Sequence, residues 1–270
     1  MKTLPNTQII ATIGPSSHTE DLLVALIEAG VDIFRINLSW EKAPEFRVTV
    51  GLIHSAIVRA NRTVKVLADL PGPRIQEGAT HTYHKDEVSC LTDHDKELIA
   101  VGVELGVDYF ALSFVGSAAD VIACRAYVDT CGGTQRVVAK IERSIAVDHM
   151  QEIISASDMV MVARGDLGNE VPLEEIPFVQ ADIITMAQAS ETPVIVATQM
   201  MLSMAEHPVP TRAEVTDVAT AVLEGAFAVM LSEESASGKY PVEAVRMMRR
   251  IVTTAHMHGL TRVHEEVLTN

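Results

Sequence analysis

Eight short apolar runs, each followed by polar or charged residues, are the feature that most limits the folds open to this chain. They cover residues 8–14, 31–37, 64–70, 109–114, 136–142, 159–166, 193–199 and 227–232. The runs are rich in β-branched residues, as is typical of strands buried on both faces of a parallel sheet. Stretches of helical period lie between most of them, for example at 19–30. Strand and helix alternating eight times predicts an α/β fold of the (β/α)8 (TIM) barrel type.

Length and composition agree with one barrel domain over residues 1–270. The chain is 48% hydrophobic, and its 270 residues are close to the roughly 250 typical of such barrels. A net charge of −15 disfavours a nucleic-acid partner, and no apolar stretch is long enough to predict a membrane span. Three unpatterned cysteines and a first segment without the apolar core of a secretory signal predict reduced thiols and a cytoplasmic location.

Charged residues stand at the carboxyl ends of the predicted strands, where barrel enzymes place their chemistry. Lys140 and Glu142 end the fifth run, and Asp166 ends the sixth. An alternative interpretation is that strand ends are polar only because they meet solvent, and this accounts well for the Ser and Thr residues there. It does not explain these three charges, because barrel interiors are usually aliphatic and a buried charge is costly unless it is paired or metal-bound. The three residues therefore predict a functional site.

Other polar residues at the strand ends would converge on the same mouth of the barrel. They are Arg35, Asn37, Ser39, Asp69, Arg74, Ser113, Arg164, Thr198, Ser232, Glu233 and Glu234. Since the carboxyl ends of all eight strands meet at one face, we expect these side chains to surround the charged centre.

The residue types at this mouth indicate a metal-assisted reaction on an acidic small molecule. Glu142 and Asp166 offer hard oxygen ligands for Mg²⁺ or Mn²⁺. The backbone N–H groups of residues 163–166 would cradle an anionic group, and Arg35 would add a second cationic contact. Lys140 can neutralise charge that develops on the substrate or move a proton. This arrangement suits stabilisation of an enolate, and we expect no organic cofactor.

Eight segments, in this order along the chain, resemble the pyruvate kinase family. They are residues 12–15, 35–39, 69–73, 140–142, 162–168, 197–200, 210–214 and 230–232. The most specific are Ala-Arg-Gly-Asp-Leu-Gly at 163–168 and Pro-Thr-Arg-Ala-Glu at 210–214. The resemblance covers almost the entire chain. It implies a barrel that acts on phosphoenolpyruvate, pyruvate or a related 2-oxo acid.

The resemblance also implies roles for matching residues. Glu142 and Asp166 would bind the divalent metal. Lys140 would be the catalytic lysine beside the transferred phosphoryl group and the enolate oxygen, and Arg35 would contact phosphate. Lys140, Arg35 and Thr198 form the predicted catalytic set. The predicted substrate-binding residues are Ala163, Arg164, Gly165, Asp166, Thr198 and Ser113. The segment 210–214 matches one near a subunit interface, which implies a homo-oligomer.

A monovalent-cation site is the second implication. Asn37, Ser39 and Asp69 match side-chain ligands of this cation in the family. At the position of Arg74, an acidic residue accompanies potassium dependence in the family and a basic residue accompanies independence. A fixed guanidinium can take the electrostatic role of the cation, so we expect Arg74 among these side chains and no potassium requirement. The alternative is a surface arginine that points to water.

Departures from the family pattern weaken the phosphate and nucleotide end of the predicted site. The family inserts a lid domain after the third strand, whereas a short loop of about residues 77–89 fills that place here. The family's further C-terminal domain has no counterpart beyond one terminal helix. Gln76 and Gly116 replace basic residues, and Trp40 replaces a histidine. Glu233, which follows Ser232, replaces a glycine of the family. The next residue, Glu234, matches an active-site carboxylate.

These losses predict a change of reaction. Phosphoryl transfer depends on positioning and charge neutralisation, and closure excludes water, whereas enolate chemistry needs only the retained half of the site. We therefore expect a metal-dependent lyase that acts through enolpyruvate, of the oxo-acid decarboxylase or aldolase type. A weakened pyruvate kinase is the first alternative, and a non-catalytic oxo-acid-binding barrel is the second. Retention of Lys140, Glu142 and Asp166 argues against the last, because a scaffold gains stability by losing buried charge.

Overall fold

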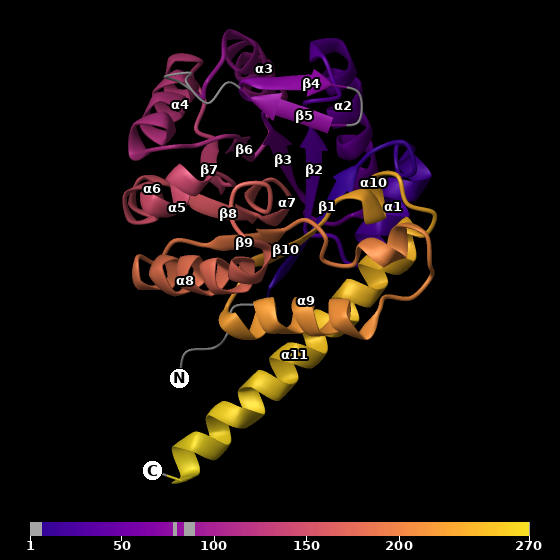
Figure 1. Cartoon of the computed structure of the whole chain (residues 1–270). Coiled ribbons are helices and arrows are strands. Elements are labelled where there is room, and N and C mark those ends of the chain that lie inside the picture. Colours follow the sequence, from indigo (N-terminus) through magenta and orange to yellow (C-terminus); the bar gives the residue numbers. More distant parts are fainter. Residues whose placement is uncertain (1–6, 78–79, 84–89, 270) are drawn as a thin grey trace.

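The computed structural model describes residues 7–77, 80–83 and 90–269. Eight parallel strands form a closed barrel in the spatial order β1, β10, β9, β8, β7, β6, β3, β2, and β2 pairs back with β1 (Figure 1). The strands are β1 (Gln8–Ile13), β2 (Ile33–Asn37), β3 (Lys65–Asp69), β6 (Tyr109–Leu112), β7 (Arg136–Ile141), β8 (Met159–Ala163), β9 (Val194–Ala197) and β10 (Ala228–Leu231). Each lies within one of the eight apolar runs, so the predicted barrel is confirmed.

Helices follow the strands and form the outer layer of the barrel (Figure 1). They are α1 (Glu20–Ala29), α2 (Ala43–Ala60), α3 (Asp93–Leu105), α4 (Ala118–Thr130), α5 (Ser144–Asp148), α6 (Met150–Ala156), α7 (Arg164–Leu167), α8 (Ile176–Ala189), α9 (Arg212–Glu224), α10 (Glu233–Ala236) and α11 (Pro241–Thr269), with short 3-10 turns at Leu173–Glu175 and Leu202–Ala205. A single turn, α7, therefore follows β8 directly and carries Asp166.

Local sequence signals fix several helix ends. The Thr19 side chain accepts from the N–H of Leu22 at the start of α1, which ends at Gly30 with φ 116°. The left-handed conformation at that end favours glycine. At the start of α3, the Asp95 carboxylate accepts from the N–H of Thr92, and the Thr92 hydroxyl accepts from the N–H of Asp95. This reciprocal capping box satisfies two N–H groups that the helix itself leaves without acceptors.

Along the inside of the barrel, side chains change from apolar to charged toward the carboxyl ends of the strands. The apolar interior consists of Ile10, Ile33, Leu67, Tyr109, Ala111, Val138, Met159, Met161, Ile195, Ala197, Ala228 and Met230. Side chains alternate between the two faces of a strand. Asp69 therefore points to the same side as Leu67, and Lys140 to the same side as Val138. A second, larger core lies between the strands and the helices.

An antiparallel hairpin, rather than a loop alone, occupies part of the segment after β3. Strands β4 (Arg74–Glu77) and β5 (Thr80–Tyr83) pair with Arg74 opposite Tyr83. The predicted short loop at 77–89 is corrected to this extent, since Thr80–Tyr83 alternates residues of high strand propensity. Residues 78–79 and 84–89 of that predicted loop lie outside the described residues. The hairpin lies above the barrel, between α2 and α3 (Figure 1).

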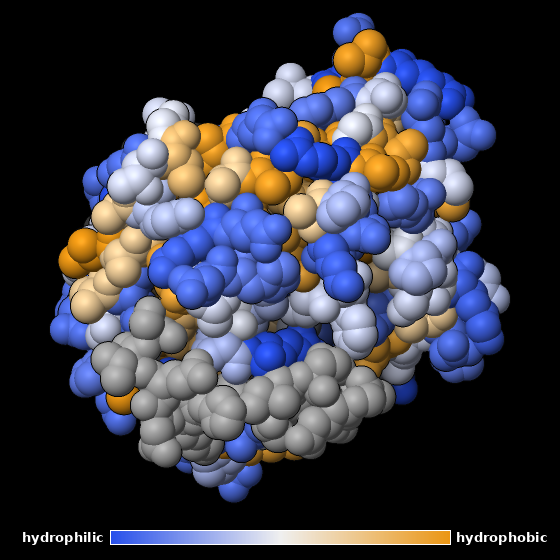
Figure 2. Space-filling view, turned by 90° about the horizontal axis from the view of Figure 1, so that it is seen from above, coloured by the Kyte–Doolittle hydropathy of each residue, from blue (hydrophilic) through white to orange (hydrophobic). Residues whose placement is uncertain are grey.

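The last helix, α11, packs against α9 and α1 through its first half, where Val245, Met248 and Val252 are buried. It then extends away from the barrel (Figure 1). Among the helices that the structure describes, none combines the length and the apolar character needed to cross a membrane. Seen from above, hydrophilic residues cover much of the visible face (Figure 2).

Candidate active site

Lys140 lies at the centre of a buried polar cluster at the carboxyl ends of three adjacent strands. Its side chain extends from β7, and only 8% of the residue is exposed. Its Nζ lies 2.7 Å from Oγ of Ser113, 3.2 Å from Oδ1 of Asp69 and 3.2 Å from Oε2 of Glu142. Because β3, β6 and β7 are neighbours in the barrel, side chains far apart in sequence meet at one cation.

The charges in this cluster are set by burial and by one another. Burial alone would lower the pKa of Lys140, but the negative charges of Asp69 and Glu142 outweigh it and raise that pKa above its usual value. Burial likewise opposes ionisation of Asp69, yet Lys140 and Arg35 hold its pKa below the usual range. Lys140 is therefore a stable cation with Asp69 as its anionic partner.

Glu142 differs, because burial and the nearby charge of Asp166 raise its pKa to about 7. Its Oε1 accepts from the N–H of Phe114 at 2.6 Å, and Phe114 itself has a left-handed φ of 60°. Its Oε2 is buried and, among the described residues, accepts no hydrogen bond; its partner is the Lys140 cation. A buried carboxylate oxygen in this state is suited to a metal ion.

Arg35 ties the first three strands together beside this cluster. Its Nε donates to Oδ2 of Asp69 at 2.7 Å, and its Nη1 donates to Oγ1 of Thr12 at 3.1 Å. The Thr12 hydroxyl in turn donates to the carbonyl of Leu231 on β10. Arg35 is thus fixed at the mouth of the barrel.

The residues predicted to surround Arg74 are divided between two groups. Arg74 donates to Oγ of Ser39 at 3.2 Å and lies over the ring of Trp40, 5.8 Å from its centroid. Asn37 accepts from the N–H of Ser39, whereas Asp69 makes its ion pairs with Arg35 and Lys140. Burial lowers the pKa of Arg74, opposed by the negative charges of Asp166, Asp69 and Glu142. Arg74 is half-buried rather than a surface residue that points to water.

The segment after β8 is held to the segment after β9. The N–H of Gly165 donates to Oγ1 of Thr198 at 2.7 Å, and Arg164 donates to the Thr198 carbonyl through Nε and Nη2, at 3.3 and 2.8 Å. Thr198 has a left-handed φ of 70°. Ala163 ends β8 opposite Ala197 of β9, which places Asp166 one turn beyond the strand.

The three residues after β10 have different surroundings. Glu234 is fully buried, and its oxygens accept from the N–H groups of Ser232 at 2.7 Å and Met201 at 3.0 Å. It therefore joins the ends of β9 and β10, at a position that matched an active-site carboxylate in the sequence. Glu233 is exposed, and Oγ of Ser232 makes no hydrogen bond to the described residues.

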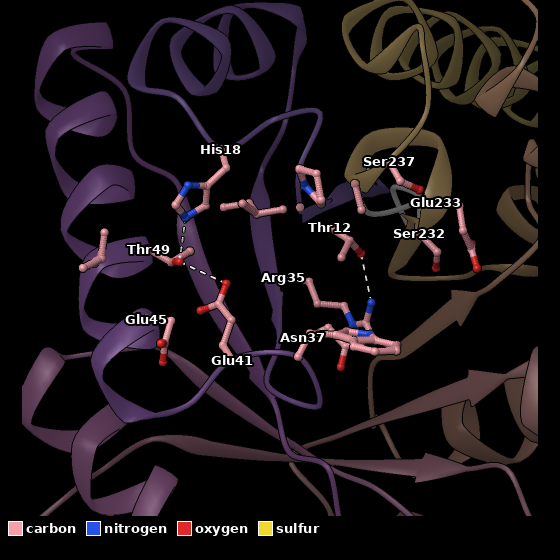
Figure 3. Close-up of a pocket in the computed structure, with 16 residues that line it drawn as sticks. Thr12, His18, Arg35, Asn37, Glu41, Glu45, Thr49, Ser232, Glu233 and Ser237 are labelled. Carbon is pink, nitrogen blue, oxygen red and sulfur yellow. Dashed lines mark hydrogen bonds between the residues drawn. The ribbon is translucent and has the colours of Figure 1, made fainter. Parts of the chain in front are cut away.

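A cavity of about 800 Å³ lies beside Arg35 (Figure 3). Its polar wall is formed by Thr12, His18, Arg35, Asn37, Glu41, Glu45, Thr49, Ser232, Glu233 and Ser237. On one side, Nε2 of His18 lies 2.9 Å from Oγ1 of Thr49, whose hydroxyl donates to Glu41 at 3.0 Å. The volume is within the range of organic-ligand sites.

Two residues that contact the site or its cavity could not be predicted as site residues from the sequence. Thr49 lies inside α2, and Asp217, which pairs with Arg164, lies inside α9. Neither follows a predicted strand. Thr12 and Trp40 could be found as strand-end residues, whereas contacts made by helices depend on how those helices pack on the barrel.

The donor set fits a hard divalent cation. The described residues contain no cluster of three or more His, Cys, Asp or Glu donors. Mg²⁺ typically takes one or two carboxylates and completes its shell with water and substrate oxygens. Glu142, whose buried Oε2 accepts no hydrogen bond from the described residues, and Asp166, close enough to raise the pKa of Glu142, match that pattern.

The fold and the site together define a class, a (β/α)8 barrel with a buried lysine and acidic residues at its carboxyl mouth. A family model described as the pyruvate kinase barrel domain matches residues 4–89 and 84–245. Pyruvate kinase of Mycobacterium tuberculosis is 38% identical over an alignment 325 positions long, which covers 91% of this chain and 69% of that protein. Pyruvate kinases of Thermococcus litoralis and Methylorubrum extorquens are 34% and 36% identical, covering 92% and 96% of this chain and 69% and 70% of their own.

The chain therefore belongs to the pyruvate kinase family, as its motifs predicted. The comparisons do not support the lyase that was expected, and they favour its alternative, a phosphotransferase. The substitutions at Gln76, Gly116 and Trp40 do not by themselves indicate a change of reaction, because the motifs around the charged centre are retained.

Proposed function

We propose that this protein transfers a phosphoryl group between phosphoenolpyruvate and a nucleoside diphosphate. In the direction of pyruvate formation, the bond between phosphorus and the enol oxygen breaks, and the phosphoryl group passes to a terminal oxygen of the diphosphate. The enolate left behind takes a proton at its methylene carbon and becomes pyruvate. Phosphoenolpyruvate, the diphosphate and one proton thus give pyruvate and the triphosphate.

The observation that carries the proposal is the cation of Lys140, held between two carboxylates at the mouth of the barrel. Its raised pKa keeps the ammonium charged at neutral pH. A fixed cation of this kind stabilises negative charge that develops on a leaving enolate oxygen. Asp69 and Ser113 hold Nζ in place, so little reorganisation is needed during the reaction.

Glu142 and Asp166 would hold Mg²⁺ or Mn²⁺, which supplies further neutralisation of phosphoryl and enolate oxygens. Thr198 and the backbone of residues 163–166 would bind the substrate carboxylate, and Arg35 would contact phosphate. These roles come from the family resemblance. They are supported by the way Thr198 and Gly165 are joined at 2.7 Å and by the fixed orientation of Arg35.

The cavity beside Arg35 offers room for the nucleotide, but its charge is unfavourable. Glu41, Glu45 and Glu233 line it, and Arg35 is already paired with Asp69. Like charges weaken the binding of a polyphosphate. Together with the hairpin segment in place of the family's lid domain, this supports slow transfer and weak nucleotide affinity.

We also propose that Arg74 takes the place of a monovalent cation. Its contact with Ser39 and the charges of Asp166, Asp69 and Glu142 around it support that role. Activity should then be the same in sodium and potassium salts. A many-fold rise on replacing sodium with potassium would contradict it. Homo-oligomer formation, which the resemblance implies, and a cytoplasmic location, which the cysteines and the first segment predict, belong to the same proposal.

One pair of assays separates the proposal from the lyase. With Mg²⁺, phosphoenolpyruvate and ADP, the protein should form pyruvate and ATP in equal amounts. With Mg²⁺, oxaloacetate and no nucleotide, it should form no pyruvate above the metal-only rate. Metal-dependent consumption of oxaloacetate without ATP formation in the first assay would favour the lyase instead. A protein inactive in both assays that still binds pyruvate would be a binding barrel.

A further inference from the structure

We propose that Asp217 is a positioning residue for this site, acting through Arg164 on the strained turn after β9. Asp217 lies on α9, outside the strand ends that carry the charged cluster. Its consequence for catalysis rests on the proposed function, whereas its effect on the turn does not.

The pair between Asp217 and Arg164 has two parallel contacts. Nη1 of Arg164 lies 2.7 Å from Oδ1, and Nη2 lies 2.8 Å from Oδ2. The Arg164 side chain is 12% exposed and that of Asp217 is 34% exposed, so the pair is shielded from water on the arginine side. Bidentate pairs of this kind fix orientation as well as adding energy.

The same guanidinium holds the turn after β9. Nε and Nη2 both donate to the carbonyl oxygen of Thr198. Thr198 and Gln199 have φ values of 70° and 54°. A left-handed conformation is uncommon for any residue with a side chain and is a true outlier for a β-branched one. Such a turn persists only when its surroundings hold it, and Arg164 is the charged group that does so.

The turn is coupled to the chain around Asp166. Oγ1 of Thr198 accepts from the N–H of Gly165, the residue next to Asp166. A Cβ on Gly165 would lie 3.4 Å from that Oγ1, so the two segments are in close contact. If Thr198 relaxes, the proposed carboxylate-binding atoms and the proposed metal ligand lose their relative position together.

Gln180 does not duplicate the role of Asp217. Its Oε1 accepts from Nη1 of Arg164 at 3.3 Å, and its amide donates to Glu224 on α9. It offers Arg164 one neutral acceptor instead of two charged ones. Asp217 is thus the residue that fixes the plane of the guanidinium.

The test is Asp217→Asn, with Glu104→Gln as the matched control. Glu104 forms an equally bidentate pair with Arg47, at 2.7 and 2.6 Å, on an exposed surface away from the site. Hydrogen exchange should become faster in residues 164–168 and 198–201 of Asp217→Asn, with the N–H of Gly165 as the most direct reporter. Exchange elsewhere, and in the control variant, should stay as in the original protein. Unchanged exchange in both segments would overturn the proposal.

Kinetics test the consequence for the reaction. Asp217→Asn should raise KM for phosphoenolpyruvate by about 10- to 100-fold, as the loss of an outer-shell partner does, with little change in KM for ADP. Asp217→Glu, which keeps the carboxylate, should recover part of the loss. Faster exchange with both KM values unchanged would overturn the positioning role.

A second variant keeps the test decisive if Asp217→Asn does not fold. Arg164→Lys keeps a positive charge beside Asp217 but cannot bind Asp217 and the Thr198 carbonyl in one fixed plane. It should give the same local gain in hydrogen exchange. Should the original protein transfer no phosphoryl group, the proposed function fails, while the exchange data still decide whether Asp217 holds the turn.

Discussion

Lys140 and Glu142 stand two residues apart at the carboxyl end of β7, and Nζ of Lys140 lies 3.2 Å from Oε2 of Glu142. Both point into the barrel, because side chains alternate along a strand. One side of the Glu142 carboxylate is held by the N–H of Phe114. The other side is thus presented, next to a cation, at the place where substrate and metal charges would meet.

Removing either proposed metal ligand should abolish tight metal binding. Glu142→Gln and Asp166→Asn each remove a charged oxygen ligand but keep the size of the side chain. Their affinity for Mn²⁺, measured by electron paramagnetic resonance without substrate, should fall by more than the roughly 10- to 100-fold that an outer-shell partner contributes. Asp148→Asn, at the end of α5, is the control. Equal Mn²⁺ affinity in all four proteins would exclude the assigned ligands.

Asp95 should matter far more for stability than its neighbour Asp93. Its buried carboxylate accepts from the N–H of Gly72 at 3.0 Å and from the N–H of Thr92 at 2.8 Å. Asp95→Ala leaves both donors without an acceptor, and each costs about 1–3 kcal/mol. The free energy of unfolding in urea should therefore fall by about 2–6 kcal/mol.

Asp93→Ala is the matched control in the same helical turn. Asp93 is 99% exposed and pairs only with Lys96 among the contacts in the described structure, so the loss should stay below about 1 kcal/mol. If both variants lost the same free energy, the buried cap would not be what links α3 to the turn after β3.

His256 should make the protein more stable at neutral than at mildly acidic pH. The N–H of Thr7 donates to its Nε2 at 3.0 Å, which requires an unprotonated nitrogen, and burial together with Arg249 lowers its pKa below 6.5. Between the lowered pKa and 6.5, the unfolded chain binds more protons than the folded one. Stability from this contact is therefore complete above about pH 6.5 and is lost as the pH falls through the lowered pKa.

The measurement is the melting temperature of His256→Gln from pH 5 to 8, with the exposed His258→Gln on the same helix as control. The destabilisation by His256→Gln should be larger at pH 7.5 than at pH 5, and that of His258→Gln should not vary. A pH-independent effect of His256→Gln would refute this account.

The barrel could be predicted because its signal is local. Each strand of four to six residues lies within an apolar run, and the capping residues Thr19 and Thr92 mark where helices begin. The charged centre could be predicted for the same reason. Lys140 and Glu142 break an apolar run at the end where barrels place their chemistry.

Other parts of the site could not be predicted, since they depend on packing between distant segments. The pairing of Asp217 with Arg164 joins a helix to a turn 53 residues away. The left-handed Thr198 contradicts the preference of a β-branched residue, so residue type would have predicted extended backbone there. Glu234 looked like a site carboxylate by position, yet its two backbone N–H partners become visible only when β9 and β10 lie side by side.

The central claim is that Lys140 supports phosphoryl transfer from phosphoenolpyruvate. Phosphorus NMR of the protein with phosphoenolpyruvate, ADP and Mg²⁺ follows both the donor and the product directly. The γ-phosphoryl signal of ATP should grow with the original protein and with the control variant Lys65→Ala. In the original protein the Lys65 ammonium contacts Tyr109 rather than the charged cluster around Lys140. Growth of the signal should be slower by orders of magnitude with Lys140→Ala. No ATP from the original protein, or equal rates with and without Lys140, would contradict the account.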